Sequence, residues 1–288
     1  MPSKKISIVL SDVDGTLLDS QKRITERAKA AIQKLRDAGI KFAVASARPP
    51  RGMKMIAEQI PLSAPIAALN GGMLVDPGTM RILTQQVLDD QTARSVIERV
   101  DQHGLDVWVY AGMNWYVRNL NAPHREAEEK AVQFAPTDVK DFELALNQGV
   151  AKILGVSDDL ALVARAETAI QDEFQNHGCG RSMTQSRECE PRVSAVRSLP
   201  FYLDVTHPKA NKGAVVETLS KLLQIPAAEF ATIGDMPNDV LMFRKSGYSI
   251  AMGHADDYVK KSANTVTAGM DDQGFATGIE NLLLWQSQ

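Results

Sequence analysis

The stretch from Ile6 to Leu18, ISIVLSDVDGTLL, constrains the fold of this chain more than any other. It opens with a short apolar run, rich in β-branched residues and without a helical period, which predicts a strand buried inside a sheet. Asp12 and Asp14 end the run, and Gly15 then turns the chain. This order places the two acids at the carboxyl edge of a sheet, where open α/β folds bind their ligands. There one carboxylate can bind a hard cation or attack an electrophile, while the other can move a proton.

Two simpler interpretations of the same residues have to be weighed. Asp-Gly-Thr is common in turns that have no function. The stretch that begins at Asp12 also resembles the start of an EF-hand calcium loop. However, its glycine comes too early, Arg23 stands at the twelfth position, and a strand precedes it rather than a helix. The calcium loop is therefore excluded, and the rest of the chain has to decide between a turn and an active site.

The composition excludes several classes of function. The chain has 288 residues, of which 44% are hydrophobic and 23% charged, and this length suits one large domain or two smaller ones. A net charge of -3 indicates neither nucleic-acid nor membrane partners. No apolar stretch is long enough to span a bilayer, and the N-terminus lacks the apolar run of a signal peptide. Only Cys179 and Cys189 are present, which is too few for a disulfide framework or a zinc site, so a cytoplasmic location is expected.

Strands and helices alternate through the first part of the chain. Thr25 is a suitable N-cap for a helix in which apolar residues recur every three or four positions, and Gly39 closes that helix. The stretch 40–46, IKFAVAS, predicts a second buried strand, and 65–70, PIAALN, predicts a third after another helix. Such alternation predicts a parallel sheet with helices on both faces and right-handed crossovers.

The pattern changes in the middle of the chain and returns near its end. Longer hairpin-like stretches and most of the aromatic residues fall between residues 83 and 206, which predicts an inserted α+β domain. The alternation of strands and helices resumes at Lys209. We therefore expect residues 1–82 and 207–288 to form a catalytic core and 83–206 to form a substrate-specificity domain.

Polar side chains follow the ends of the predicted core strands. The set comprises Asp12, Asp14, Ser46, Lys212, Asp235, Asn238 and Asp239. Carboxylates gathered at one edge require a cation, and oxygen ligands favour Mg²⁺. A hydroxyl group and a lysine beside a helix start favour a bound phosphate, and a carboxylate next to Mg²⁺ can accept a phosphoryl group. Taken singly, Lys212 could be a solvated helix residue, Ser46 a polar strand end, and the stretch 235–239 a capped helix entry.

At this point the chain resembles the haloacid dehalogenase-like (HAD) superfamily, and within it the Cof-type phosphatases. DVDGTLL is similar to the first motif of the family, ASAR to the second, the pair Lys212-Gly213 to the third, and GDMPND to the fourth. The insertion after the second motif matches a type II, subclass B cap in position and size. The resemblance implies a Rossmann-like HAD core with an inserted α+β cap, and hydrolysis of a phosphate ester in the cytoplasm.

The resemblance also implies a role for each site residue. Asp12 would be the nucleophile that forms an aspartyl-phosphate, and Asp14 the general acid and then the base, with Thr16 orienting it. Mg²⁺ would be held by Asp12, the backbone carbonyl of Asp14 and Asp235, with Asp239 behind them in the second shell. The phosphoryl oxygens would be held by Ser46, Lys212 and Asn238.

Two positions depart from the family pattern. Ala47 replaces a common glycine, which should matter little because only a backbone amide is needed there. His254 stands where the family commonly has asparagine, in Gly253-His254-Ala255. A histidine near the site could alter substrate contacts, although an exposed loop histidine is the simpler interpretation.

The substrate and two alternative functions stay open. The family acts on sugar phosphates, phosphorylated cofactors and other small phosphorylated metabolites, and a monomer or homodimer is expected. Trp115 and Tyr116 could stack on a substrate ring or belong to the core of the cap. A phosphosugar mutase would need a second phosphate site, to which Arg118, Arg125, Arg187 and Arg192 could contribute. A non-catalytic regulator that binds a phosphorylated metabolite is disfavoured because every chemical residue is present.

Overall fold

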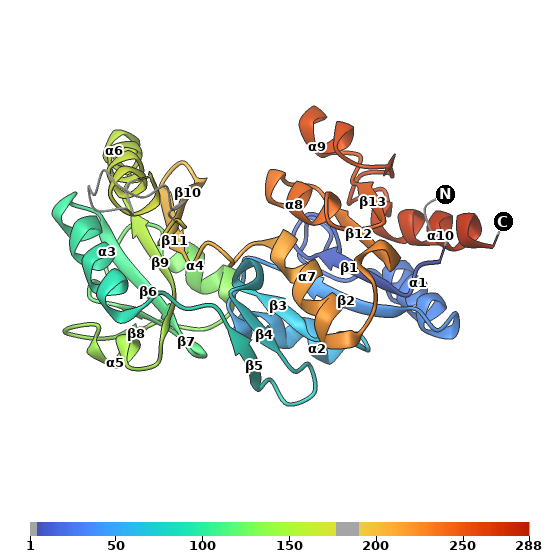
Figure 1. Ribbon diagram of the computed structural model, residues 1–288, viewed down its shortest axis with the longest axis horizontal. Coiled ribbons are helices and arrows are strands. Elements are labelled where there is room, and N and C mark those ends of the chain that lie inside the picture. Colours follow the sequence, from blue (N-terminus) through green and yellow to red (C-terminus); the bar gives the residue numbers. More distant parts are fainter. Residues whose placement is uncertain (1–4, 177–189, 288) are drawn as a thin grey trace, which may run out of the picture. The chain divides into compact units, whose positions relative to one another are not determined.

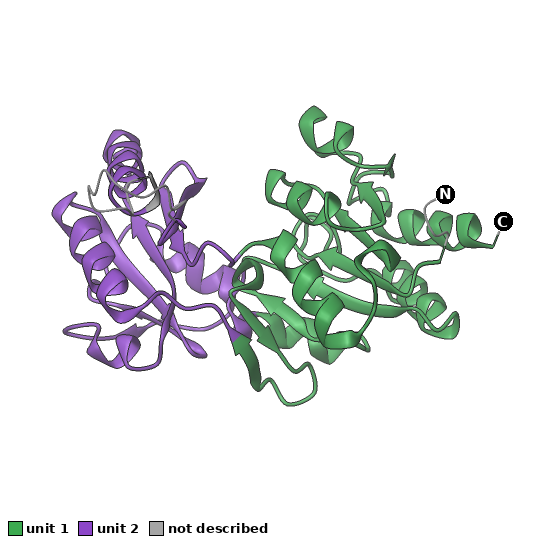
Figure 2. Ribbon diagram, viewed as in Figure 1, with its two compact units in different colours: residues 1–47, 53–84, 211–288 green, residues 48–52, 85–210 purple. Residues whose placement is uncertain are grey.

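The computed structural model describes residues 5–176 and 190–287 (Figure 1). Cys179, Arg187 and Cys189, which entered the sequence analysis, lie outside these residues. The chain divides into two compact units (Figure 2). The first comprises residues 1–47, 53–84 and 211–288, and the second comprises 48–52 and 85–210. Each unit has a sheet and a core of its own.

The first unit is built on an eight-stranded sheet in which β1 (Ile8–Asp12) has a central position. β1 pairs in parallel with β12 on one side and with β2 on the other, so Leu10 lies opposite Thr232 and Ala43. β3 and β4 pair antiparallel. The predicted α/β class with a parallel core sheet is therefore confirmed. In sheet order the strands are β14 (Thr265–Val266), β13 (Tyr248–Ala251), β12 (Phe230–Gly234), β1, β2 (Lys41–Ala45), β3 (Ile66–Ala68), β4 (Met73–Val75) and β5 (Ile82–Gln85).

Helices cover both faces of this sheet. Leu10 and its neighbours on one face pack in one apolar cluster with α7, α8 and α9. On the opposite face Phe42 contacts Phe275 of α10, and Glu280 of α10 binds Arg27 and Lys34 of α1. The helices of this unit are α1 (Glu26–Asp37), α2 (Lys54–Gln59), α7 (Lys212–Leu223), α8 (Val240–Phe243), α9 (Asp257–Lys261) and α10 (Gly274–Gln286), with 3₁₀ turns at Leu69–Gly71, Ala227–Glu229 and Pro237–Asp239. A further 3₁₀ turn, Pro50–Met53, belongs to the second unit except for its last residue.

The first helix forms for the reason that the sequence indicates. The Thr25 side chain accepts a hydrogen bond from the backbone N–H of Ala28, which satisfies one of the free donors of the first turn. The periodic apolar residues of α1 are the ones that are buried, and they are Ala28, Ala31, Ile32 and Leu35. The predicted N-cap and buried face are thus both confirmed.

The second unit has a six-stranded sheet, and helices α3 and α6 pack on one of its faces. β6 pairs with β7 and β9, and β9 with β11, all antiparallel; β7 and β8 are parallel. Val107 and Val109 of β6 lie in an apolar cluster with α3 and α6. The strands are, in sheet order, β10 (Ser194–Leu199), β11 (Tyr202–Thr206), β9 (Val150–Val156), β6 (Asp106–Ala111), β7 (Asn114–Val117) and β8 (Thr137–Asp138), and the helices are α3 (Asp90–Gln102), α4 (Arg125–Val132), α5 (Glu143–Leu146), α6 (Leu160–Ile170) and a π-helical turn at Gln171–Asn176.

The aromatic residues of the second unit are mostly part of its core. Trp115 and Tyr116 are almost completely buried, and Trp115 stacks on Tyr110 with the ring centroids 5.9 Å apart. These two side chains therefore belong to the core, which was the simpler of their two interpretations. Among the residues that the structure describes, no helix combines the length and the apolar character needed to cross a membrane.

The central strand gives a first test of the fold. Leu10 is completely buried, whereas Leu284 on α10 is 65% exposed. We expect Leu10→Ala to lower the free energy of unfolding by about 2–5 kcal/mol, because the lost side chain leaves a cavity between the sheet and its helices. Leu284→Ala should change it by less than about 0.5 kcal/mol. Urea titration followed by circular dichroism measures both. Equal effects of the two substitutions would show that β1 is not in the core.

Candidate active site

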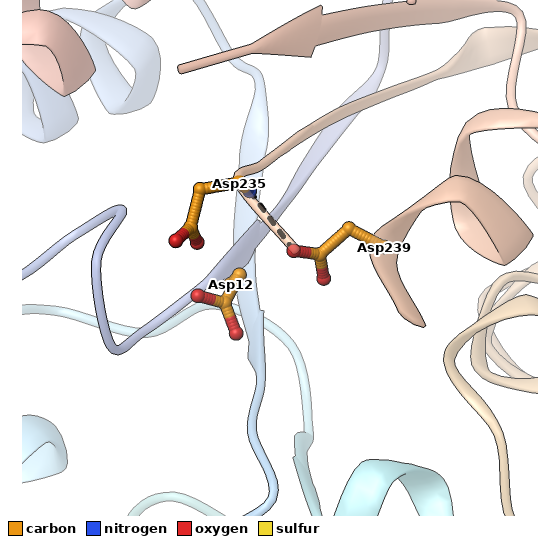
Figure 3. Close-up of side chains that lie close together, drawn as sticks. All are labelled: Asp12, Asp235 and Asp239. Atoms are coloured by element: carbon orange, nitrogen blue, oxygen red, sulfur yellow. Dashed lines mark hydrogen bonds between the residues drawn. The ribbon is translucent and has the colours of Figure 1, made fainter. Parts of the chain in front are cut away.

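Three carboxylates meet at the carboxyl ends of two neighbouring parallel strands. Asp12 is the last residue of β1, Asp235 follows β12 directly, and Asp239 ends the 3₁₀ turn behind it. One oxygen of each lies within 4.8 Å of one oxygen of the others, and all three side chains are buried (Figure 3). The structure thus brings together three of the acids that the sequence analysis singled out.

A buried lysine partly neutralises these acids. Lys212, the first residue of α7, is only 2% exposed. Its Nζ lies 2.5 Å from Asp12 Oδ1 and 2.6 Å from Asp239 Oδ1. The solvated-helix interpretation of this lysine is therefore wrong. When all four groups are charged, three carboxylates and one ammonium group leave an excess of negative charge.

Burial and the neighbouring charges act on the pKa values in opposite directions. Burial raises the pKa of Asp12 well above its ordinary value; the Lys212 ammonium opposes this effect, and the other two carboxylates add to it. Burial and Asp239 likewise raise the pKa of Asp235. For Lys212, burial lowers the pKa, but the attraction of Asp12 and Asp239 outweighs it, so that the pKa is raised. Lys212 is therefore kept in its ammonium form, whereas the carboxylates of Asp12 and Asp235 can bind either a proton or a metal cation.

Fixed hydrogen bonds hold Asp235 and Asp239. Asp239 Oδ2 accepts the backbone N–H groups of Asp235 and Met236, each at 2.9 Å. Thr16 Oγ1 donates to Asp235 Oδ1 at 2.9 Å. The hydroxyl of Thr16 has a single proton to donate, so the expectation that it orients Asp14 is corrected: it orients Asp235.

Gly15 makes room for Asp235. Its φ of +87° is strained for any residue with a side chain. In addition, a Cβ atom at this position would lie 2.5 Å from Asp235 Oδ2. The glycine of the first motif is therefore required both by the turn and by the close approach of a carboxylate from another strand.

Asp14 lies outside the three-carboxylate cluster and has a partner that the sequence did not indicate. Its side chain is 35% exposed, and Lys22 Nζ lies 2.8 Å from its Oδ1. Lys22 adopts a positive φ of 60° in the turn that follows β1. A lysine between polar residues gives no pattern from which this contact could have been predicted.

The remaining predicted residues lie near the same sheet edge. Ser46 directly follows β2 and is buried, and its carbonyl accepts the N–H of Asn70 at 2.7 Å. Asn238 Nδ2 donates to Asn70 Oδ1 at 3.3 Å. The other amide atom, Asn238 Oδ1, is buried without a hydrogen-bond partner among the described residues. Asn70, at the end of β3, was not predicted as a site residue, although it follows a strand in the same way as the others.

The cluster is suited to a divalent cation. Asp12 Oδ2 is buried and has no hydrogen-bond partner among the described residues, which is costly for a carboxylate oxygen. Oxygen donors with excess negative charge are the ligands that hard divalent cations prefer. Asp12 and Asp235 could hold such an ion. Asp239, whose two oxygens are engaged by Lys212 and by backbone amides, would lie behind them.

Comparison with known proteins identifies the family. The sequence model of the haloacid dehalogenase-like hydrolases matches residues 9–279. The chain belongs to this family. It is 25% identical to a 5-amino-6-(5-phospho-D-ribitylamino)uracil phosphatase of Bacillus subtilis, over 96% of this chain and 97% of that protein. It is 27% identical to the HMP-PP phosphatase of Cronobacter sakazakii, over 85% of this chain and 83% of that one.

A solved structure agrees with this assignment. The crystal structure of a haloacid dehalogenase-like hydrolase from Bacteroides thetaiotaomicron superposes with a TM-score of 0.84 at 25% identity and covers 96% of this chain and 100% of its own. The Cof-type HAD phosphatase expected from the motifs is thereby confirmed at the level of family and enzyme class.

The raised pKa values predict how cation binding depends on pH. In the absence of a cation, the folded protein favours the protonated form of a carboxyl group whose pKa is raised. This contribution to the free energy of unfolding is fully present below the ordinary pKa of aspartate, and it is lost as the pH rises through the raised pKa. A cation requires ionised carboxylates, so it should stabilise the protein more as the pH rises. We expect MgCl₂ to raise the melting temperature more at about pH 8 than at about pH 5. Thermal scans with MgCl₂ and with EDTA measure this. A rise that is larger in acid would contradict it.

Proposed function

We propose that this chain is a Mg²⁺-dependent phosphatase that hydrolyses a small phosphorylated metabolite through an aspartyl-phosphate. The observation that carries the proposal is the position of Asp12 at the end of the central strand. Its Oδ1 is bound by Lys212, and its Oδ2 is buried with no hydrogen-bond partner in the described parts of the chain. Such an oxygen can serve as a nucleophile or as a cation ligand.

In the first step Asp12 attacks the phosphorus atom of the substrate. A bond forms from a carboxylate oxygen of Asp12 to phosphorus, and the bond from phosphorus to the ester oxygen breaks. Lys212, buried beside Asp12, keeps a positive charge at the place where the phosphoryl group arrives. Ser46 and Asn238, at the ends of neighbouring elements, would donate hydrogen bonds to the phosphoryl oxygens.

Asp14 moves the proton in both steps. In the first it protonates the departing ester oxygen. In the second it removes a proton from the water that attacks phosphorus, while the bond from phosphorus to Asp12 breaks, so that inorganic phosphate leaves and the Asp12 carboxylate is restored. The partial exposure of Asp14 suits this role, because the side chain has to meet a leaving group and then a water molecule. Lys22 Nζ donates to Oδ1 of this side chain and holds it at the sheet edge.

Magnesium would be held by Asp12, Asp235 and the backbone carbonyl of Asp14, with Asp239 in the second shell. When bound, the ion neutralises charge on the phosphoryl group and brings it close to a carboxylate that would otherwise repel it. Asp239 positions other site residues: one of its oxygens binds Lys212, and the other accepts hydrogen bonds from the backbone that follows β12.

The substrate class follows from the family. Two relatives are named for phosphorylated small molecules, and we propose a sugar phosphate or a phosphorylated cofactor for this chain as well. We further propose that residues 83–206 form the cap that selects the substrate, and that the enzyme is cytoplasmic and either a monomer or a homodimer.

Three of the four arginines considered for a mutase have other partners, and the fourth, Arg187, lies outside the described residues. Arg118 binds Asp101 at 2.7 Å, Arg125 binds Glu129, and Arg192 donates to Thr92 at 2.5 Å. Hydrolysis is therefore favoured over phosphosugar transfer. The presence of both Asp12 and Asp14 likewise argues against a regulator without activity.

Metal dependence is the first test of this proposal. We expect hydrolysis of an aryl phosphate to stop when EDTA removes divalent cations and to return when MgCl₂ is added in excess. The physical reason is the excess negative charge around Asp12, which would otherwise repel the phosphate. Release of phosphate is measured after each addition. Full activity in excess EDTA would remove the metal from the mechanism.

Substitution of the two neighbouring acids separates their roles. Asp12→Asn should abolish formation of the phosphoenzyme because it removes the nucleophile. Asp14→Asn should slow turnover by about 10²–10⁴-fold, since it removes only proton transfer. With a good leaving group, Asp14→Asn should accumulate an aspartyl-phosphate, because an amide cannot activate the second water. Mass spectrometry of both variants after mixing with substrate locates the phosphate. Phosphate on Asp14 would reverse the two assignments.

A further inference from the structure

His254 lies between the proposed cation site and a distant backbone segment. It occupies the loop between β13 and α9. Its Nε2 lies 3.4 Å from Asp235 Oδ2, and its Nδ1 lies 3.3 Å from the backbone nitrogen of Met270. The ring therefore uses both nitrogens, although its side chain is 32% exposed.

The contact with Met270 determines whether His254 donates or accepts the hydrogen bond with Asp235. A backbone N–H can only donate, so Nδ1 of His254 must accept it. A neutral imidazole carries one proton, which is then on Nε2 and is directed at Asp235 Oδ2. The arrangement fixes a histidine that donates to a carboxylate and cannot accept from it.

With this contact, both oxygens of Asp235 are restrained. Oδ1 receives the Thr16 hydroxyl and Oδ2 receives His254, from segments that lie on either side of Asp235 in the sequence. The torsion about the Cβ–Cγ bond of an aspartate is broad when nothing restrains it. A donor on each oxygen restricts that torsion and hence the direction from which the carboxylate meets a cation.

We propose that His254 is a positioning residue that orients Asp235 for the divalent cation. This inference rests on the cation of the proposed function. Partners that orient a ligand side chain typically change metal affinity by about 10–100-fold when they are replaced. The effect should appear in the binding of the metal itself, before any substrate is present.

A purely structural role is the competing explanation. The contact with Met270 connects the loop after β13 with the segment before α10. Its loss could change the conformation of these two segments and so affect metal binding indirectly. The two ring nitrogens allow these roles to be separated. The amide group of an asparagine reaches the position of Nδ1, whereas that of a glutamine reaches the position of Nε2. His254→Asn therefore keeps an acceptor for Met270, and His254→Gln keeps a donor for Asp235.

Isothermal titration with Mg²⁺, without substrate, compares wild type, His254→Gln and His254→Asn. We expect His254→Asn to weaken binding by about 10–100-fold and His254→Gln to stay close to wild type. His103→Asn, in the other compact unit, is the control and should have no effect. In turnover assays, His254→Asn should need more Mg²⁺ for half-maximal rate, whereas kcat at saturating Mg²⁺ should stay close to that of wild type.

The opposite order of affinities would overturn the inference, because it would assign His254 to the loop alone. Unchanged binding in both variants would overturn it while leaving the proposed phosphatase intact. Absence of Mg²⁺ binding in wild type would instead refute the cation of the proposed function, and the positioning role with it. A crystal structure of His254→Asn supplies an independent readout, in which the Asp235 carboxylate should be rotated relative to wild type.

Discussion

The ion pairs of Lys212 with Asp12 and Asp239 are the interaction on which the site depends. Three carboxylates at one sheet edge repel one another, and burial adds a large desolvation cost. A lysine that is 2% exposed offsets part of this cost from the first position of α7. Because α7 packs on the face of the sheet that contains Leu10, the apolar core holds this cation in place. Packing and chemistry are therefore coupled: the cluster exists only while the sheet and α7 stay together.

The sequence predicted the features that depend on local pattern. Buried strands are recognisable from apolar runs, and Asp12, Ser46 and Asp235 could be placed at their carboxyl ends because parallel strands end at a common edge. Thr25 could be identified as a cap because capping is local. The magnesium interpretation followed from the gathering of several carboxylates at one edge and from the preference of Mg²⁺ for oxygen ligands. For these residues, the local sequence pattern is sufficient to identify the end of the strand or helix at which they lie.

Contacts between distant side chains could not be predicted in this way. Thr16 binds Asp235 rather than Asp14, and Lys22 reaches Asp14 across a turn with positive φ. Both depend on side-chain directions that no periodicity encodes. His254 was expected to be a loop residue, and only the three-dimensional arrangement shows its ring beside Asp235. Sequence thus locates the strand ends that bear the chemistry, whereas packing decides which partners orient each group.

The pairing of β1 with β12 has a consequence for the synthesis of this protein. Ile8 lies opposite Phe230, so the central strand finds this neighbour only after most of the chain has been made. Such long-range pairing closes slowly, and parallel sheets expose unpaired edges until it is complete. A nascent chain that has not reached β12 contains Asp12 but neither Asp235 nor Asp239. The three-carboxylate cluster therefore cannot assemble until β12 and the turn behind it have been made, and these lie within the last quarter of the sequence.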